Sequence, residues 1–390
     1  MRKGESLMKS KSILKVMSIT AVSAAIVGAA LLHSSISSAA VGAMDEIKLS
    51  DINGHWAAEQ IGNAVKSGYV DGYEDGTFLP EKSVSRAEFI TMLTKALKLK
   101  TGEEGSAWYT KYNNAVVSAG IHRYADFKQD INGAISRQEM MRLVVRATRP
   151  DFQKPESEVS DKAFVYQAVK AGLIQGFDRG ALGLDDATNR AQAVMVIDRV
   201  LKINGGGKLD VDKAALSYAE VNLNGSNTRT MWNTQSVALP TKVDLGSNVD
   251  VTLDKIIVVD MDDPNGAYKE WFPNEAIGKS NKKPLGSEYL VAVHYVIENK
   301  TAQDHEFFSI MRLRPEGFTW GAILPEKQYL TPIKGTQGFY LDEVKTMDGW
   351  YLMTTEKKWV DKAVSDSLPI LESFVYISDT SIKFPLTLRN

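Results

Sequence analysis

Three short stretches decide the fold: Ser85–Glu88 (Ser-Arg-Ala-Glu), Ser136–Glu139 (Ser-Arg-Gln-Glu) and Asn189–Gln192 (Asn-Arg-Ala-Gln). Each stretch begins with a short oxygen-bearing side chain and ends, three residues later, with Glu or Gln. This pattern is typical of a capping box, in which the first and fourth side chains each accept a backbone N–H at the start of a helix. The sequence therefore predicts three helices, each with arginine at its first position.

An apolar stripe follows each of these capping boxes. Counted from the arginine, positions +3, +6, +7 and +10 are apolar in all three copies: Phe89, Met92, Leu93 and Ala96; Met140, Leu143, Val144 and Ala147; Ala193, Val196, Ile197 and Val200. This spacing places the apolar side chains on one face of a helix. We expect each helix to bury that face against other helices.

A second amphipathic stretch precedes each capping box and ends in glycine. These glycines, Gly68, Gly120 and Gly172, lie 52 residues apart. Glycine after an apolar-periodic run indicates a helix end, because glycine enters the left-handed backbone region at little cost. Each repeat is therefore predicted to be helix, loop, helix. One such pair cannot bury its apolar stripe alone, so the three repeats should pack on one another.

The first repeat carries further motifs around this frame, namely Leu49–Asp51, His55–Ala57, Gly68–Gly72, Asp75–Pro80 and Val84–Phe89. With them the chain resembles a tandem of S-layer homology (SLH) domains over roughly residues 45–203, with repeats at 45–100, 105–149 and 159–203. The resemblance implies an all-α assembly of three helix-loop-helix prongs around a pseudo-threefold axis.

The resemblance also implies a function. A non-catalytic surface protein of a Gram-positive-type bacterium would bind, non-covalently, a secondary cell-wall polysaccharide attached to peptidoglycan and commonly pyruvylated. Sugar sites would lie in grooves between the prongs, and other surface proteins are further candidate partners. A helix N-terminus and an arginine fork both favour a carboxylate. The candidate ligand-binding residues are Arg86, Arg137, Arg190, Ser85, Glu88, Ser136, Asn189, Gln192, Trp56, Gly72, Asp75, Gly76 and Gly176.

Other interpretations of these residues stay open. A capping box stabilises a helix whether or not a ligand binds. Trp56 and Trp108 fall on apolar faces of expected helices, where core packing is more common than a ligand platform. The second repeat departs most from the pattern, with Gln138 in place of a small residue and Asp126–Gln129 in place of the acidic-Gly-Thr-Phe string. Its groove is the one that we expect to be non-functional.

The N-terminus predicts an export signal at residues 1–40. Basic residues come first, then the uncharged, largely apolar stretch Val16–Leu32, then the small residues Ser38–Ala40. This is the order of a secretory signal peptide. Cleavage would follow Ala40 or Ala43 and would leave no membrane-spanning segment. A membrane anchor is less expected than a signal peptide, because the apolar stretch is shorter than the roughly 20 residues that span a bilayer.

The C-terminal part changes from helical to alternating periodicity. Residues 204–240 are predicted as a linker with one short helix, and residues 241–390 as an all-β antiparallel sandwich. The strongest strand patterns are Val249–Val259 and Tyr289–Ile297. A weaker resemblance, carried by the segment from Gly286 to Lys300, is to extracellular immunoglobulin-like domains.

Composition limits the chemistry of the chain. The 390 residues include no cysteine, which excludes disulfides and thiolate chemistry. The formal net charge of −2 does not favour a nucleic-acid partner. No catalytic constellation, cofactor site or metal site is predicted; the oxygen-rich segment Asp260–Asn265 misses the calcium-binding register, so a turn is expected there. The alternatives are a wall-associated glycan or peptide hydrolase with its active site in the C-terminal domain, and a structural S-layer subunit.

Overall fold

A computed structural model of the chain describes residues 49–154, 159–243, 248–271, 288–301, 305–313, 339–341, 345–367, 371–377 and 380–388. The predicted signal peptide at 1–40 lies outside these residues. The described residues belong to one compact part, Ile47–Asn390. Among the described helices, none combines the length and the apolar character that crossing a membrane requires.

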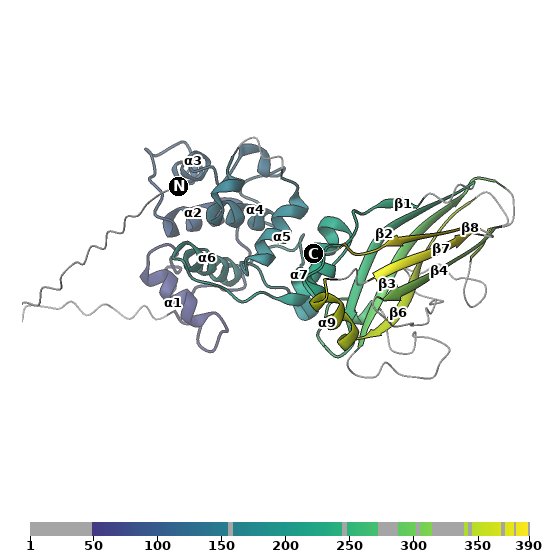
Figure 1. Cartoon of the computed structure of the whole chain (residues 1–390). Helices are drawn as coiled ribbons and strands as arrows, with labels where there is room; N and C mark the ends of the chain where they lie inside the picture. Colours follow the sequence, from purple (N-terminus) through teal and green to yellow (C-terminus); the bar gives the residue numbers. More distant parts are fainter. Residues whose placement is uncertain are drawn as a thin grey trace, which may run out of the picture. The chain divides into compact units, whose positions relative to one another are not determined.

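Three helix-loop-helix units occupy the N-terminal half of the described chain (Figure 1). Unit one contains α1 (Ala58–Lys66) and α2 (Arg86–Ala96), unit two α3 (Thr110–Ser118) and α4 (Arg137–Thr148), and unit three α5 (Asp161–Lys170) and α6 (Arg190–Asn204). The glycines predicted to end the first helices, Gly68, Gly120 and Gly172, have φ angles of 73°, 70° and 71°. The predicted left-handed helix ends are therefore confirmed.

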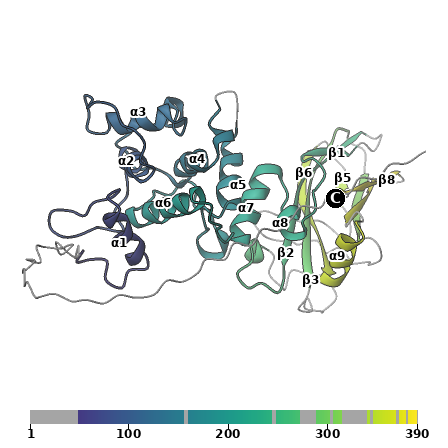
Figure 2. The same cartoon turned by 60° about the vertical axis from the view of Figure 1, so that its left-hand side comes forward.

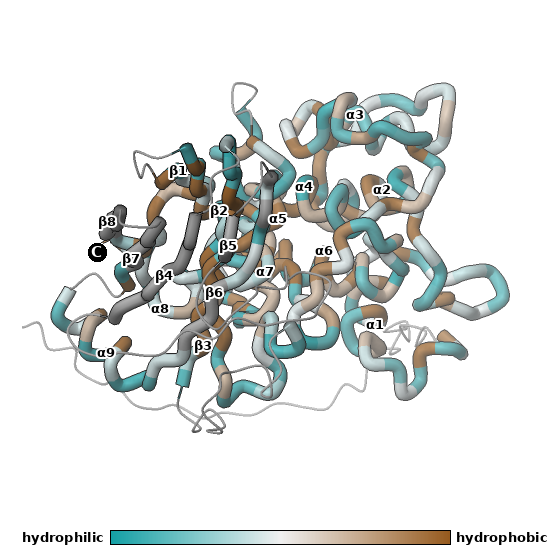
Figure 3. Tube along the Cα trace, turned by 90° about the vertical axis from the view of Figure 1, so that its right-hand side faces the viewer, coloured by the Kyte–Doolittle hydropathy of each residue, from teal (hydrophilic) through white to brown (hydrophobic). Residues whose placement is uncertain are grey.

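All three capping boxes form. In unit one the Ser85 hydroxyl accepts the Glu88 N–H at 3.1 Å, and the Glu88 carboxylate accepts the Ser85 N–H at 2.7 Å. Units two and three repeat the arrangement with Ser136 and Glu139 and with Asn189 and Gln192. Buried residues of the predicted apolar stripes from all three units contribute to one core. Figure 3 shows apolar and hydrophilic segments alternating along these helices, as expected for amphipathic helices.

The three units are joined in a closed cycle by backbone hydrogen bonds. The residue before each capping box donates its N–H to its counterpart in another unit: Val84 to the Thr188 carbonyl, Thr188 to Ile135, and Ile135 to Val84, each at 2.9 Å. The first helical N–H of each second helix is likewise satisfied by a loop carbonyl of another unit. Each unit thus supplies carbonyl acceptors for the helix start of another unit in the cycle.

The segment predicted as a linker, 204–240, contains two helices, α7 (Lys213–Asn224) and α8 (Thr228–Trp232). One side of α7 contributes Ala215 and Ala219 to the core of the helical units. Its other side packs Ala214 and Tyr218 against apolar residues of a β-sheet. In Figure 2, α7 lies beside α5 and α8 lies beside β2. The segment is therefore a packed element of the fold.

Among the described residues, the C-terminal module contains two four-stranded antiparallel sheets. The first has the order β1-β2-β3-β6 and the second β5-β4-β7-β8. Their bounds are Thr241–Val243 for β1, Val249–Asp260 for β2, Glu288–Asn299 for β3, His305–Leu313 for β4, Phe339–Leu341 for β5, Lys345–Glu356 for β6, Leu371–Ile377 for β7 and Thr380–Pro385 for β8. The helix α9 (Lys357–Ser365) follows β6, so the prediction of an all-β module is wrong in this respect.

Candidate functional site

The arginine that begins α6 connects unit three to unit one. The Arg190 side chain donates from Nε to the Phe78 carbonyl and from Nη2 to the Asp71 carbonyl, both at 2.8 Å. Its guanidinium lies 4.4 Å from the Phe78 ring centre and 5.0 Å from that of Tyr73. We call this set of contacts the Arg190 junction. Arg190 is 8% exposed, and its Nη1 has no hydrogen-bond partner among the described residues.

The arginine that begins α4 makes the same contacts between units two and three. Arg137 donates from Nε to the Leu182 carbonyl at 2.9 Å and from Nη2 to the Gln175 carbonyl at 3.0 Å. The Phe177 ring lies 4.2 Å from its guanidinium. In this Arg137 junction, burial lowers the pKa of Arg137, and nearby Asp186 offsets part of that effect. Within the described chain its Nη1 also lacks a hydrogen-bond partner.

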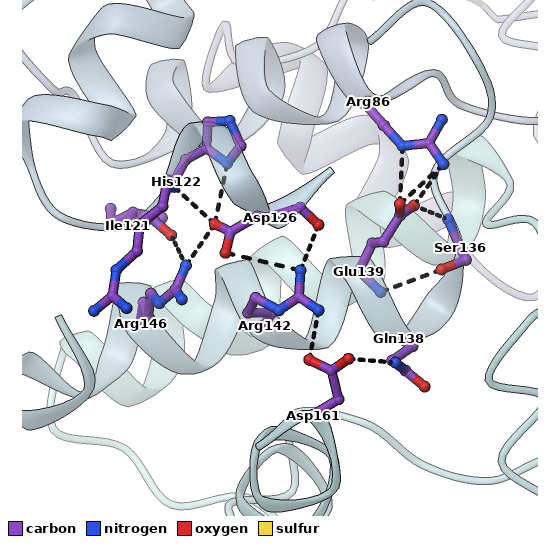
Figure 4. A network of polar contacts seen from close by, with 11 residues as sticks. Arg86, Ile121, His122, Asp126, Ser136, Gln138, Glu139, Arg142, Arg146 and Asp161 are labelled. Carbon is purple, nitrogen blue, oxygen red and sulfur yellow. Dashed lines mark hydrogen bonds and ion pairs between the residues drawn. The ribbon is translucent and has the colours of Figure 1, made fainter. Parts of the chain in front are cut away.

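The Arg86 junction, between units one and two, is different (Figure 4). Arg86 donates from Nη1 to the Asp130 carbonyl at 3.0 Å, but Nε and Nη2 bond the Glu139 carboxylate at 3.0 and 2.9 Å. By the 52-residue spacing, the carbonyl equivalent to those of Asp71 and Gln175 belongs to Arg123. That carbonyl accepts the Asp126 N–H at 2.9 Å. Arg86 therefore holds a carboxylate of the protein itself.

A buried polar cluster lies in the loop of unit two. The Asp126 carboxylate contacts His122 at 3.2 Å and Arg146 at 2.5 Å, and its backbone carbonyl accepts a hydrogen bond from Arg142 (Figure 4). Burial raises the pKa of Asp126, but hydrogen bonds from His122 and Arg146 outweigh burial and lower it to about 2. In the sequence, Asp126 stands out only as part of a departure from the motif. Its spacing from Arg142 and Arg146, on a following helix, was the available signal.

Both tryptophans expected to pack in the core are exposed. Trp56 is 60% exposed and Trp108 is 54% exposed, because each precedes the first residue of its helix. The core interpretation is therefore wrong for both. Trp56 lies against His55, which contacts Glu81 at 3.1 Å, and Glu81 accepts a hydrogen bond from the Asn189 side chain at 2.6 Å. These contacts bring the predicted residues Trp56 and Asn189 toward the same junction between units three and one.

The remaining predicted residues of unit one shape its loop. Gly72 lies so close to Leu49 that an added Cβ would approach that side chain to 2.7 Å. The Asp75 carboxylate accepts hydrogen bonds from the hydroxyl and backbone N–H of Thr77, which lower its pKa. Gly76 has a φ of 78°, which favours glycine. Each of these residues has a clear role in the loop conformation.

Gly176 has a comparable role in unit three. Its N–H donates to the Asp212 carboxylate at 3.0 Å, and a Cβ at this position would collide with the Gly180 backbone. Asp212 is also the N-cap of α7 and accepts the Ala215 N–H at 3.0 Å. The loop of unit three is thus fastened to the start of α7.

Several carboxylates in the C-terminal module contact basic side chains. The Lys357 ammonium lies 2.6 Å from Asp260 and 2.8 Å from Asp262, in the segment considered for Ca²⁺. Asp254, the extra residue of a β-bulge in β2, contacts His294 at 2.5 Å. Within the described residues, no group of three or more His, Cys, Asp or Glu side chains is placed to hold a metal ion.

Comparison with known proteins gives the class of the N-terminal part. Residues 48–90 match the S-layer homology domain model, so the chain contains an SLH domain. The cellulosome-anchoring protein of Acetivibrio thermocellus is 35% identical over 143 residues, which cover 33% of this chain and 32% of that protein. S-layer protein sap of Bacillus anthracis is 32% identical over 25% of this chain and 13% of its own length.

Enzymes also share similarity with this chain. Exoglucanase XynX of Acetivibrio thermocellus is 27% identical over 177 residues, which cover 40% of this chain and 16% of the exoglucanase. The chain thus spans a third or less of the length of these relatives. The SLH domain and the S-layer relatives agree with the location predicted from the sequence, the cell wall or surface layer of a Gram-positive-type bacterium.

Proposed function

We propose that this chain is a non-catalytic surface protein, held non-covalently on a secondary cell-wall polysaccharide by three SLH repeats. The three helical units correspond to these repeats, and the C-terminal module, immunoglobulin-like in this proposal, is displayed outward. The observation that carries the proposal is the SLH domain at 48–90 together with an equivalent arginine that bonds across each of the three junctions, at two of them to matching backbone carbonyls.

The chemistry of two junctions suits an acidic sugar. At Arg137 and Arg190 the guanidinium lies at a helix N-terminus, where the helix dipole favours an anion. Two donors of each arginine are fixed by carbonyls, so the group is held in one orientation with Nη1 left to bond a ligand. An aromatic ring lies beside each guanidinium. A pyruvate ketal places one carboxylate on a sugar ring and fits this combination.

Several weak sites on one molecule would give strong retention. Once one site is occupied, the others meet the same polymer at a high effective concentration. The exposed Trp56 would offer a flat surface to a sugar ring beside the Arg190 junction.

The direct test is sedimentation of the full chain with purified wall sacculi, before and after chemical removal of the secondary polymer. We expect binding to untreated walls and its loss from stripped walls. Equal binding to both would contradict a polysaccharide partner.

A residue-level test uses substitutions that keep the positive charge of the arginine but remove its planar guanidinium group. Arg137→Lys and Arg190→Lys should each weaken wall binding several-fold, because lysine cannot hold the two carbonyls and a carboxylate together. Arg149→Lys is the matched control, since Arg149 is partly exposed and pairs with Asp151 within its own loop. Wall binding equal to that of the control in both variants would remove these arginines from the site.

The hydrolase alternative is kept because relatives include an exoglucanase and an amylopullulanase. We expect no release of reducing sugars or peptides from wall polymers by the purified chain. The S-layer alternative predicts ordered lattices of purified protein in electron micrographs, and we expect none.

A further inference from the structure

We propose that the Arg86 junction is occupied from within: the Glu139 carboxylate takes the place at Arg86 that an acid group of the wall polymer takes at Arg137 and Arg190. This inference rests on the proposed function and concerns the regulation of the same type of site. It makes Glu139 the residue that decides how many junctions accept ligand.

The contact between the two side chains has the form of ligand recognition. Glu139 receives two N–H groups of the Arg86 fork, at 3.0 and 2.9 Å, and also accepts the Ser136 backbone N–H at 2.9 Å (Figure 4). A planar guanidinium that donates twice to one carboxylate, beside a helix N-terminus, is the arrangement that proteins use to bind acidic groups. The Arg86 and Glu139 side chains are 4% and 16% exposed.

The backbone explains why this happens at one junction. At the other two junctions Nη2 is held by the carbonyl of Asp71 or Gln175. In unit two the short helical turn Tyr124–Asp126 uses the equivalent Arg123 carbonyl for its own hydrogen bond. Arg86 lacks that acceptor, and the Glu139 carboxylate supplies one. The buried contacts of Asp126 with His122 and Arg146 hold this turn in place.

The residue equivalent to Glu139 differs between units. Near Arg137 the equivalent position is Gln192, which carries no charge, and in unit one it is Glu88. Glu88 caps its own helix through Ser85, and no ion pair joins it to Arg190 in the described part of the chain. Of the three arginines at the junctions, only Arg86 thus bonds a carboxylate of the described residues.

Neutralising Glu139 while keeping its cap tests the inference. Glu139→Gln should preserve the helix start, because Asn189 and Gln192 form the same capping box with an amide. Glu103→Gln is the matched control, since it makes the same change at an exposed carboxylate in the loop before α3. The probe is a methyl pyranoside carrying a pyruvate ketal, with its neutral methyl ester as the uncharged control, titrated into the purified full chain by calorimetry.

We expect two acid-dependent sites per chain in the wild type and in Glu103→Gln, and three in Glu139→Gln. A count of two in all three proteins would overturn the inference and leave the proposed function intact. A count of three in the wild type would also overturn it. Absence of acid-dependent binding in every protein would overturn the proposed function and this inference together.

A second variant separates a gained site from a general change in folding. Arg86→Lys combined with Glu139→Gln should return the count to two, because lysine lacks the fork. Retention of three sites in the double variant would show that the added site does not use Arg86, which contradicts the inference. Circular dichroism and thermal unfolding of each variant establish that the compared chains are folded.

Discussion

The helical units and the β-module use buried polar groups in different ways. In the helical units, Arg86, Arg137 and Arg190 are all less than 10% exposed and donate across unit boundaries. In the first sheet of the β-module, the buried side chains between neighbouring strands are mostly apolar, as with Leu253 and Tyr295. Three copies of one contact can be compared with each other, whereas a single module offers no internal control.

In the helical units, the largest loss of stability is expected from substitution of Asp126. Asp126→Ala leaves Arg146 buried without its carboxylate, and removal of one member of a buried ion pair costs about 3–5 kcal/mol. Chemical denaturation monitored by circular dichroism measures the loss. Asp178→Ala, at a side chain that is 86% exposed, serves as the control and should change little. Equal stability of the two variants would contradict the buried cluster.

A comparable loss in the β-module should follow from an apolar change. Leu253→Ala removes a fully buried side chain from the core of the first sheet and should cost about 2–5 kcal/mol. Wall sedimentation by the folded variant should equal that of the wild type, because the proposed sites lie in the helical units. Weaker sedimentation at a temperature where the variant is folded would bring the β-module into polymer binding.

Acid should act on the helical units through the same carboxylate. The pKa of Asp126 is lowered to about 2 in the folded chain, so its contribution is complete above the unfolded value near 4. Stability on the order of 2 kcal/mol is therefore lost as the pH falls from about 4 to 2. Denaturation at a series of pH values measures this slope. In Asp126→Asn that part of the slope should be absent; an unchanged slope would assign acid sensitivity to other groups.

The smallest effects are expected at the helix caps. Ser136→Ala and Asn189→Ala each remove one side-chain acceptor for a helix N–H, which should lower the unfolding free energy by about 1 kcal/mol. Similar losses in both would support the equivalence of the capping boxes. A loss several times larger in one variant would mean that its side chain has a further structural role.

Local features were predicted well because nearby residues determine them. The capping boxes at Ser85, Ser136 and Asn189 depend on residues three positions apart, and the structure reproduces each. Gly68 and its two counterparts likewise follow from the end of an apolar pattern. For the strands, alternation predicted β2 and β3 within one or two residues.

Contacts between residues far apart in the sequence could not be predicted from it. Arg190 bonds a carbonyl 119 residues away, and nothing near position 190 identifies Asp71 as the acceptor. The exposure of Trp56 was missed because the helix begins two residues later than its apolar pattern suggested. The helix α7 was expected in part, but its packing against both the helical units and a sheet depends on elements distant in sequence.

The cycle of hydrogen bonds through Val84, Thr188 and Ile135 has a consequence for how the chain can be shortened. In a linear array of repeats, removal of the last member exposes one face, and a special end repeat can cover it. A ring of three has no last member. Deletion of any one unit would expose two faces at once and would leave a helix start on one neighbour and a loop on the other without their partners. Three is therefore the smallest number of units that this arrangement can keep.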